Sequence, residues 1–421
     1  YATGNVSVYS SSSHFSSAGG LVGWGCSGSS ISDSYATGDV YISFYPSSTS
    51  TSSTPKSYAG GLVGNNGNSS ITNSYSTGNV YAFSSESVYV GGLIGYSGGT
   101  SDSITNSYST GNVYASSSNA YAGGLLGGNS YGISISNSYA TGDVYADSTS
   151  STSSTSSTPE ACAGGLVGDN SDGSISDSYA TGNVSASSSN VYAGGLAGNN
   201  GYRCSISNSY ATGDVSASSS SSSSSVYAGG LLGQNSGSIT NNYYYSGSTV
   251  DAGTTGTKTS YGTGLTLEQI TGNRKGRAKD NMTGFSEDNW EFPGDNGLIK
   301  YLPRLKVITY NETTNPAPRL VGPISSDFDF KSPANLTYNG SQKVATVTSE
   351  ILEIPDDKIT IKYYNSSGTK LTSPPKNAGT YTVKIDVAAG DKYEAKTDIT
   401  AGTWKFTIAK ANPTIKSIST S

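Results

Sequence analysis

Residues alternate strictly in character along 31–41, near the start of the chain. One set of alternate positions holds mostly large or polar side chains, namely Ile31, Asp33, Tyr35, Thr37, Asp39 and Tyr41. The other set holds small ones, namely Ser32, Ser34, Ala36, Gly38 and Val40. A period of two predicts a β-strand with two different faces. The face of small residues would let a neighbouring wall of the structure approach closely.

This pattern recurs through the first half of the chain. A block Ser-Tyr-Ala/Ser-Thr-Gly-Asn/Asp-Val repeats with its tyrosine at Tyr35, Tyr75, Tyr108, Tyr139, Tyr179 and Tyr210. A second block, Gly-Gly-Leu-x-Gly, repeats with its leucine at Leu21, Leu62, Leu93, Leu125, Leu166, Leu196 and Leu231. The leucines are 30 to 41 residues apart. The two longest spacings contain Ser/Thr-rich inserts that end at Lys56 and Glu160, which we interpret as loops or O-glycosylation sites.

The repeat predicts a parallel β-solenoid of about seven coils over residues 1–245. Each coil would bury one Leu, one Val or Ile and several small residues, so only stacked coils could share a core. The register places an Asn or Asp of each coil in a first column, at Asp33, Asn73, Asn106, Asn137, Asp177, Asn208 and Asn241. A second column holds Asn5, Asp39, Asn79, Asn112, Asp143, Asn183 and Asp214. We expect amide ladders in both columns.

Composition fits thin coils better than one large apolar core. Val, Ile, Leu and Phe make up about one sixth of the 421 residues, below the ~20% at which disorder becomes an alternative. No run approaches the ~20 apolar residues of a transmembrane helix, so we expect no direct membrane insertion of this segment. Residues 1–245 carry eleven acidic and two basic side chains, a net charge of −9. This acidic balance argues against nucleic-acid binding.

Few residues are available for catalysis or metal binding. His14 is the one histidine, which excludes a zinc protease with two histidine ligands inside this segment. The three cysteines Cys26, Cys162 and Cys204 are too few for a disulfide scaffold. We therefore predict no enzyme activity, no catalytic residues, no cofactor and no metal. Since the chain begins in mid-pattern, we expect a monomeric fragment of a longer protein.

The chain changes character after residue 245. A Thr-x-x-Gln capping box at 266–269 predicts a short helix. Large apolar residues follow, and we expect residues 246–314 to form a cap over the last coil. The basic run of Arg274, Lys275, Arg277 and Lys279 is interpreted as a solvated helix end, with an acidic partner surface as the alternative. Residues 315–323 are proline-rich and predict a linker.

Four short apolar or alternating runs follow the linker, at 343–348, 358–364, 380–387 and 403–408. Turn signals such as Asn339-Gly340 and Ser367-Gly368 separate them. This pattern predicts a small antiparallel β-sandwich over 324–412. Residues 413–421 would then be a tail or the start of a next repeat.

Two family resemblances refine this picture. Ala-Gly-Gly-Leu-Val-Gly at 59–64, followed by Ile-Thr-Asn-Ser-Tyr-Ser-Thr-Gly-Asn-Val at 71–80, resembles the GLUG-motif repeat of large bacterial surface proteins. The stretches at 336–340, 363–369, 377–383 and 406–411 resemble the MBG family of bacterial immunoglobulin-like domains, which often serve as spacers. The resemblances imply an exported, non-catalytic stalk or display module on the bacterial cell surface.

Tyrosine forms three columns, the first being the repeat tyrosines themselves. The second lies four residues before each leucine, at Tyr58, Tyr89, Tyr121, Tyr192 and Tyr227, with Cys162 as a buried or half-buried substitute. The third follows the repeat valine at Tyr41, Tyr81, Tyr114 and Tyr145, and becomes Ser185 and Ser216. We expect most rings to stack on one another along the wall. The third column is the best candidate for ligand binding, because a column that stops halfway is not needed by the coil.

Two further motifs suggest other ligands. Asp169-Asn-Ser-Asp-Gly173 resembles a calcium turn, but the repeats of a calcium-binding β-roll are missing and we interpret it as an ordinary turn. A threonine in each coil suggests ice binding, which the adjacent large tyrosines disfavour.

The sequence thus predicts an all-β protein with a parallel β-solenoid, its C-terminal cap and an immunoglobulin-like antiparallel β-sandwich. The predicted role is adhesion or display at the bacterial cell surface, with a host-surface protein or a glycan as partner. One alternative is a non-catalytic accessory region of a secreted peptidase or other hydrolase. A solenoid enzyme acting on polysaccharides is the other, but equivalent repeated aspartates argue against one unique pair of catalytic carboxylates.

Overall fold

The computed structural model describes residues 1–11, 15–25, 28–45, 55–148, 159–219, 225–254, 256–271, 278–293, 302–310, 315, 323, 325–349, 354–389 and 395–412. The chain divides into two compact units. The first holds residues 1–270, 279–291 and 303–318, and the second holds 271–278, 292–302 and 319–421. His14, Cys26, both Ser/Thr inserts, most of the basic run and linker, and the tail at 413–421 lie outside the described residues.

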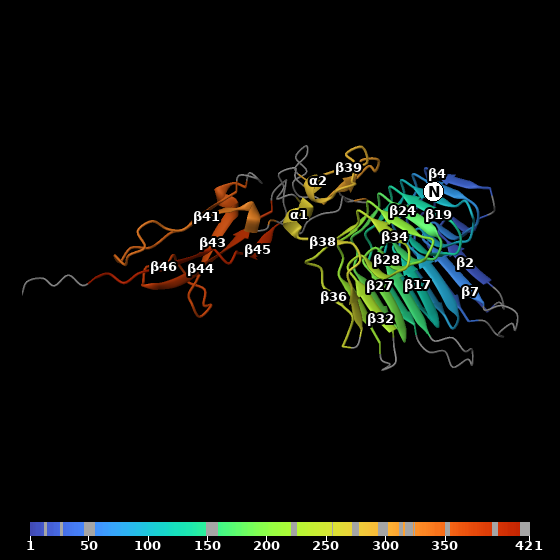
Figure 1. Ribbon diagram of the computed structural model, residues 1–421, viewed down its shortest axis with the longest axis horizontal. Helices are drawn as coiled ribbons and strands as arrows, with labels where there is room; N and C mark the ends of the chain where they lie inside the picture. Colours follow the sequence, from blue (N-terminus) through green and yellow to red (C-terminus); the bar gives the residue numbers. More distant parts are fainter. Residues whose placement is uncertain are drawn as a thin grey trace, which may run out of the picture. The chain divides into compact units, whose positions relative to one another are not determined.

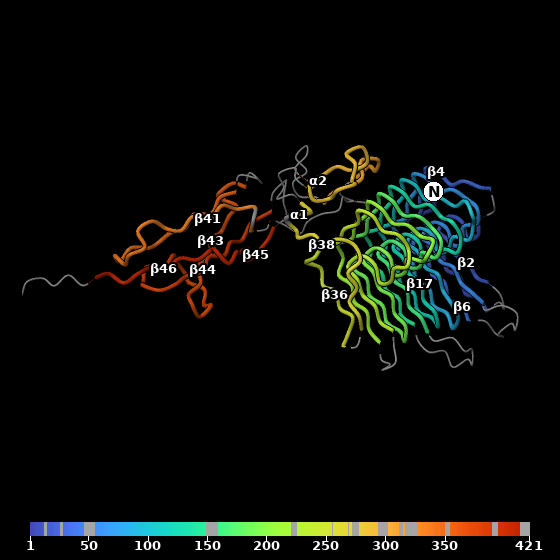
Figure 2. The backbone as a smooth tube through the Cα atoms, viewed as in Figure 1, coloured from blue at the N-terminus to red at the C-terminus, as the bar shows by residue number. Residues whose placement is uncertain are grey.

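The first unit is a parallel β-solenoid, as the repeat predicts. Five parallel sheets run along it, and each coil supplies one short strand to each sheet. Figures 1 and 2 show successive coils side by side, ordered along the sequence from blue to yellow-green. The second unit contains small antiparallel sheets. These observations confirm the all-β solenoid class.

Sheet 1 begins each coil with the repeat valine. It consists of β1 (Val6–Ser10), β6 (Val40–Phe44), β11 (Val80–Ser84), β16 (Val113–Ser117), β21 (Val144–Ser148), β26 (Val184–Ser187), β31 (Val215–Ser218) and β36 (Val250–Asp251). Sheet 2 follows with β2 (Phe15–Gly19), β7 (Lys56–Gly60), β12 (Ser87–Gly91), β17 (Asn119–Gly123), β22 (Glu160–Gly164), β27 (Asn190–Gly194), β32 (Ser225–Gly229) and β37 (Thr257–Thr259).

Sheet 3 carries the residues after the repeat leucine. Its strands are β3 (Val22–Trp24), β8 (Val63–Asn66), β13 (Ile94–Ser97), β18 (Leu126–Asn129), β23 (Val167–Asn170), β28 (Ala197–Asn200) and β33 (Leu232–Asn235). Sheet 4 carries the repeat isoleucine in β4 (Ser30–Ser32), β9 (Ser70–Thr72), β14 (Ser103–Thr105), β19 (Ile133–Ser136), β24 (Gly173–Ser176), β29 (Ser205–Ser207) and β34 (Ser238–Thr240).

Sheet 5 carries the repeat tyrosine and completes the coil. It consists of β5 (Tyr35–Ala36), β10 (Tyr75–Ser76), β15 (Tyr108–Ser109), β20 (Tyr139–Ala140), β25 (Tyr179–Ala180), β30 (Tyr210–Ala211), β35 (Tyr243–Tyr245) and β38 (Thr263–Leu265). The strands β36, β37 and β38 belong to an eighth, partial coil. The solenoid sheets therefore extend to Leu265, beyond the boundary at 245 that the repeat predicts.

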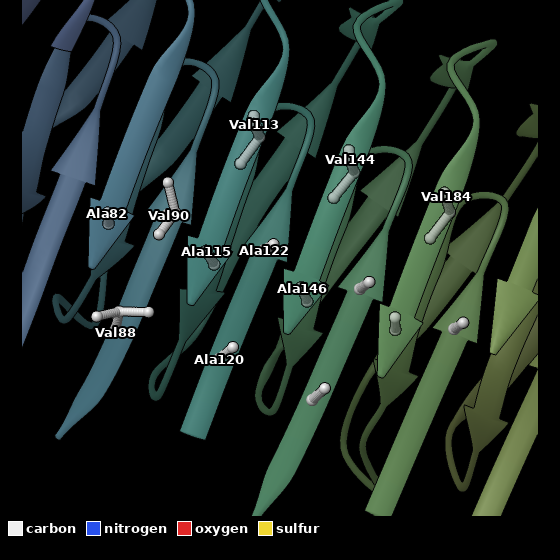
Figure 3. Close-up of a cluster of buried hydrophobic side chains, with 14 of the residues drawn as sticks. Ala82, Val88, Val90, Val113, Ala115, Ala120, Ala122, Val144, Ala146 and Val184 are labelled. Carbon is white, nitrogen blue, oxygen red and sulfur yellow. The ribbon is translucent and has the colours of Figure 1, made fainter. Parts of the chain in front are cut away.

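The core has two compartments rather than one. Valine and alanine from sheets 1 and 2 form the first, in which the valines of successive coils lie in a row (Figure 3). Leucine, isoleucine and alanine from sheets 3, 4 and 5 form the second. Small residues keep both the walls and the coils close: a Cβ built on Gly61 would overlap Ser76 Oγ of β10 in the same coil, and one built on Gly78 would overlap the Gly38 carbonyl oxygen of the preceding coil. The low apolar content is thus a consequence of narrow coils.

At the first Asn/Asp column, the backbone of each coil bends at a corner between sheet 4 and sheet 5, which the alternating sequence pattern does not indicate. Residues 31–41 are three strands, not the single strand that strict alternation predicts. Asp33, between β4 and β5, has a left-handed φ of 49°, and Asn73 in the next coil has 51°. Asn and Asp tolerate this conformation better than other residues with a side chain. The corner resets the alternation, so both Ile71 and Ser76 face inwards in the second coil.

The two columns bond in different ways. In the first, amide ladders form as expected: Asn106 Nδ2 donates to Asn73 Oδ1 at 3.2 Å, and Asn241 Nδ2 donates to Asn208 Oδ1 at 3.3 Å. In the second, each Oδ1 accepts a backbone N–H of the next coil, as Asp39 does from Asn79 at 2.7 Å. Because only an oxygen is needed there, Asn and Asp are interchangeable.

Short elements follow the last coil. The helices α1 (Leu267–Thr271) and α2 (Ala278–Asn281) are one turn each. The capping box is present, because Gln269 N–H donates to Thr266 Oγ1 at 3.2 Å and Thr266 N–H to Gln269 Oε1 at 2.9 Å. A two-stranded antiparallel sheet joins β39 (Trp290–Glu291) and β40 (Arg304–Leu305).

The second unit packs two antiparallel sheets around an aromatic core. One joins β41 (Asp329–Lys331) and β42 (Thr346–Thr348). The other joins β43 (Ile359–Tyr364), β44 (Gly379–Val387), β45 (Lys396–Ile399) and β46 (Lys405–Ile408). The 3₁₀ turns η3 (Ser325–Asp327) and η4 (Asp356–Lys358) precede β41 and β43. Each of the four runs predicted after the linker contains a strand, whereas β41 and β45 were missed because they are short and polar.

Candidate binding surface on the tyrosine columns

The third tyrosine column lies on the outer face of sheet 1. In β11, Val80 and Ala82 point into the core, so Tyr81 between them points out. The parallel register pairs Tyr41 with Tyr81, Tyr81 with Tyr114, and Tyr114 with Tyr145. The structure thus places all four predicted residues on one wall.

Their rings do not form one uniform stack. Tyr81 and Tyr114 stack at 5.0 Å between ring centroids, and Tyr114 and Tyr145 stack at 4.7 Å with planes 2° apart. Tyr41 instead has a tilted contact with Phe83 at 5.6 Å. Phe83 was missed by sequence reasoning, although it lies on the same parity as Tyr81. The continuous stack of the column therefore consists of Tyr81, Tyr114 and Tyr145.

The stack ends at Tyr145, where a depression begins. Tyr145 is paired with Ser185, and Ser185 with Ser216, so no ring follows in the next two coils. Tyr145 is 38% exposed. The depression measures about 380 Å³ and is lined by Tyr145, Asn183, Val184, Ser185, Asp214, Val215, Ser216, Thr249 and Asp251. An aromatic ring, two serine hydroxyls and two carboxylates thus line one depression.

Carboxylates lie near the tyrosines of sheet 1. Burial raises the pKa of Tyr81 and Tyr145, and the charges of Asp39 and Asp143 raise it further. These phenols therefore stay protonated at neutral pH and can donate hydrogen bonds. At the rim of the depression, Asp214 Oδ1 accepts the Thr249 N–H at 2.6 Å. Asp251 Oδ1 likewise accepts the Gly253 N–H at 3.0 Å.

The second column lies on sheet 2 and is interrupted. Tyr89 and Tyr121 stack at 4.5 Å, and Tyr192 and Tyr227 at 5.7 Å. Cys162, which separates the two pairs, is buried at 1% exposure and donates its thiol to Glu160 Oε1 at 3.1 Å. The prediction of a buried substitution at Cys162 agrees with this position. Burial raises the pKa of the Cys162 thiol well above its usual range.

The first column on sheet 5 is an unbroken stack. From Tyr1 to Tyr210, each ring lies 4.7–5.2 Å from the next, with planes within 8°. Stacking of the repeat tyrosines along the wall is what we expected. Each such pair contributes ~0.5–1.5 kcal/mol beyond area burial.

Residues after the last coil cover the C-terminal part of this tyrosine column, from Tyr139 to Tyr243. We call them the strap, which consists of Thr283, Phe285, Trp290, Pro303, Tyr310 and Asn315. Each covered tyrosine bonds to it: Tyr139 donates to Asn315 Oδ1, Tyr210 to the Pro303 carbonyl, and Tyr243 to the Thr283 carbonyl, while Tyr179 pairs with the Tyr310 hydroxyl. Five of these six residues belong to 246–314, which we expected to cap the last coil, and Asn315 belongs to the predicted linker. Their contacts instead lie along the side of the solenoid.

The turn at 169–173 is held by side-chain hydrogen bonds. Asp169 accepts hydrogen bonds from Asn199 Nδ2 and Ser171 Oγ, both at 2.8 Å, and so closes the turn that resembles a calcium loop. Among the described residues, no group of three or more His, Cys, Asp or Glu side chains could hold a metal ion. No described helix combines the length and apolar character needed to cross a membrane.

Comparisons with known proteins identify the repeat. No curated protein and no solved structure matches the chain. One family model matches five segments, and each matched segment runs from sheet 2 of one coil to sheet 1 of the next. Residues 57–81, 86–114, 118–145, 160–185 and 189–216 match the family described as the GLUG motif, so this part of the solenoid consists of GLUG repeats.

Proposed function

We propose that the chain is a non-catalytic module of a bacterial surface protein and that it binds carbohydrate at the end of the sheet 1 tyrosine stack. GLUG repeats are typical of extracellular bacterial proteins. The observation that carries the proposal is Tyr145, whose exposed ring borders a depression with Ser185 and Ser216 in register beyond it.

The chemistry of this depression fits a sugar. The apolar face of a sugar ring packs on an aromatic ring, and its hydroxyls need several donors and acceptors around the edge. Here the serine hydroxyls and the Asn183 amide can donate, and the Asp214 and Asp251 carboxylates can accept. Tyr114 supports Tyr145 from behind at 4.7 Å, so the ring is already held in place before a ligand arrives.

A non-catalytic role is supported by what the carboxylates do. Asp214 and Asp251 in the depression each accept a backbone N–H, and Asp39 and Asp143 do the same in other coils. The second unit would hold the solenoid away from the cell as an immunoglobulin-like spacer of the MBG type. Its antiparallel sheets and core of Val383, Trp404 and Phe406 support that role.

The test is a glycan array probed with the full chain, with Tyr145→Ser as the matched variant. Serine already occupies the equivalent position in the next two coils, so this variant should fold. Binding by the wild type that is lost in the variant supports the proposal. Absence of binding to every glycan, or binding that Tyr145→Ser leaves unchanged, refutes it. Turnover of any polysaccharide in a substrate panel would overturn the non-catalytic role.

A further inference from the structure

Trp290 of the strap occupies a defined seat on sheet 5. Its ring has tilted contacts with Tyr179 at 6.2 Å and with Tyr210 at 5.7 Å between centroids. Its indole Nε1–H donates to Asp177 Oδ1 at 3.2 Å. Asp177 is the corner residue two positions before Tyr179, with a φ of 44°. The seat therefore consists of a corner aspartate, the tyrosine of its own coil and the tyrosine of the next.

The same seat occurs a second time in the solenoid. The corner column from 33 to 241 contains aspartate at only two of its seven positions, Asp33 and Asp177, and asparagine at the others. Asp33 has the same left-handed conformation, with a φ of 49°. Tyr35 and Tyr75 follow it in the same relation, stacked at 5.0 Å with planes 5° apart. The backbone geometry and the three side chains of the Trp290 seat are thus repeated.

The second seat is open. Asp33 is exposed and Tyr35 and Tyr75 are half-buried, whereas Tyr179 and Tyr210 under the strap are fully buried. Within the described part of the chain, the hydroxyls of Tyr35 and Tyr75 make no hydrogen bond, while each strap-covered tyrosine hydroxyl has one. Asp33 Oδ1 accepts from Asn73 Nδ2 at 3.2 Å, and an ionised carboxylate has further acceptor positions.

We propose that the Asp33–Tyr35–Tyr75 seat docks a tryptophan-bearing peptide segment of another protein, in the way that the Asp177 seat holds Trp290, which follows a turn closed by its own N–H on the Ser286 carbonyl at 2.9 Å. The tyrosine stack of sheet 5 is continuous from one seat to the other. The contacts of Trp290 therefore indicate which side chain can bind to this wall. An aspartate is a stronger acceptor for an indole N–H than the asparagine of the other coils, because the bond is charge-assisted.

The negative charge of the solenoid restricts the charge of the peptide that can bind. Residues 1–245 carry a net charge of −9, so an acidic peptide would be repelled and a basic or neutral one attracted. The chain segment that carries Trp290 also contains Glu287, Asp288 and Glu291, but Lys279 pairs with Glu287 at 2.5 Å and Arg304 with Glu291 at 2.9 Å, so two of these charges are compensated within the chain. The partner segment is therefore predicted to be aromatic and not acidic. This surface is on sheet 5, and the proposal is independent of carbohydrate binding on sheet 1.

The test uses a synthetic peptide with the sequence of residues 284–291, in which the residues equivalent to Glu287, Asp288 and Glu291 are replaced by lysine, serine and lysine. It is titrated into the full chain by calorimetry, with a Trp-to-Ala version of the peptide as the control. We expect saturable binding, at least tenfold weaker for the control peptide. Asp33→Asn, which preserves a residue suited to the left-handed corner, should weaken binding at least threefold.

The variant Asp177→Asn distinguishes peptide binding at the open seat from binding at the seat of Trp290. If the peptide docks at the open seat, this variant binds as the wild type does. Weakening by Asp177→Asn but not by Asp33→Asn would mean that the peptide displaces the strap, and would overturn the proposal. Absence of saturable binding, or equal binding of the control peptide, would also overturn it. Circular dichroism of each variant checks that the solenoid remains folded.

Discussion

Tyr145 and Ser185 are Cα partners in the neighbouring parallel strands β21 and β26, and the tyrosine stack of sheet 1 ends between them. The fold does not require a ring at this position, since β26 and β31 keep the same register with serine. The rings at Tyr81, Tyr114 and Tyr145 are therefore available for a role that packing does not impose. The change from Tyr145 in one coil to Ser185 in the next is what defines the candidate site.

The first prediction concerns the corner column. Asn106→Gly keeps the left-handed corner and removes the hydrogen bond to Asn73 Oδ1, at a cost of about 1 kcal/mol. Asn106→Ala should cost a further ~1–2 kcal/mol, because alanine is strained at a φ of 52°. Urea unfolding of the two variants measures the difference. Equal stability of the Gly and Ala variants would contradict a conformational role for the corner.

The second prediction concerns the column that caps the backbone. Asn112 Oδ1 accepts the Asp143 N–H at 2.8 Å, so Asn112→Ala should leave that donor unpaired and cost ~1–3 kcal/mol. Asp143→Asn keeps an oxygen for the Asn183 N–H and should change the free energy of unfolding little. Chemical denaturation of both variants tests this contrast. A destabilisation by Asp143→Asn as large as that by Asn112→Ala would show that charge matters there.

The third prediction is a pH dependence at Asp169. Burial raises the pKa of Asp169 in the folded chain, despite hydrogen bonds from Asn199 and Ser171. A raised folded pKa means that ionisation of this carboxyl destabilises the fold, and the penalty disappears at pH values below the unfolded pKa of ~3.9. Asp169→Asn, which matches Asn199 in register, should therefore stabilise the chain at pH 7. The gain should shrink as the pH falls towards 4.

Thermal unfolding of wild type and Asp169→Asn over that pH range measures the effect. Asp147→Asn is a suitable control, because Asp147 is exposed on sheet 1. A gain from Asp169→Asn that is constant with pH, or absent at pH 7, would contradict the assignment of a partly buried charge that destabilises the fold.

The fourth prediction concerns thiol reactivity. Cys162 and Cys204 are buried, and burial raises the pKa of both thiols. Because the thiolate is the reactive form, both should resist an aromatic disulfide reagent at pH 8 until the chain unfolds. A Cys26→Ser variant makes the assay specific for these two. Rapid reaction of that variant in the folded state would show that the coils around Cys162 or Cys204 open readily.

Much of this fold could be predicted from the sequence because each coil repeats the same physical solution. The positions of Leu62, Val80 and Ala82 recur in every coil, and all three are buried as their pattern predicts. The corner at Asp33 could not be predicted from alternation. A left-handed residue changes which alternate positions face the core, but the distance between repeats along the sequence stays the same. Its signal was the restriction of the column to Asn and Asp, which we interpreted only as a ladder.

The site was predicted in part, for a related reason. The end of the column at Ser185 is visible in the sequence, but the depression depends on residues of four successive coils, including Thr249 and Asp251 beyond the predicted solenoid boundary. The strap could not be located from the sequence, because Trp290 lies 113 residues after its partner Asp177. Its aromatic residues indicated that a surface is covered, and the structure shows that this surface is the tyrosine wall.

The most direct test of the proposed site places a side chain in the depression instead of removing Tyr145. Ser185→Tyr would continue the stack of Tyr81, Tyr114 and Tyr145 by one ring and cover the exposed face of Tyr145, while every wild-type aromatic residue remains. Titration of the glycan selected on the array should show at least tenfold weaker binding to Ser185→Tyr and to Tyr145→Ser. Tyr227→Ser on sheet 2 should bind like the wild type. Undiminished binding to Ser185→Tyr would contradict carbohydrate recognition at the end of this stack.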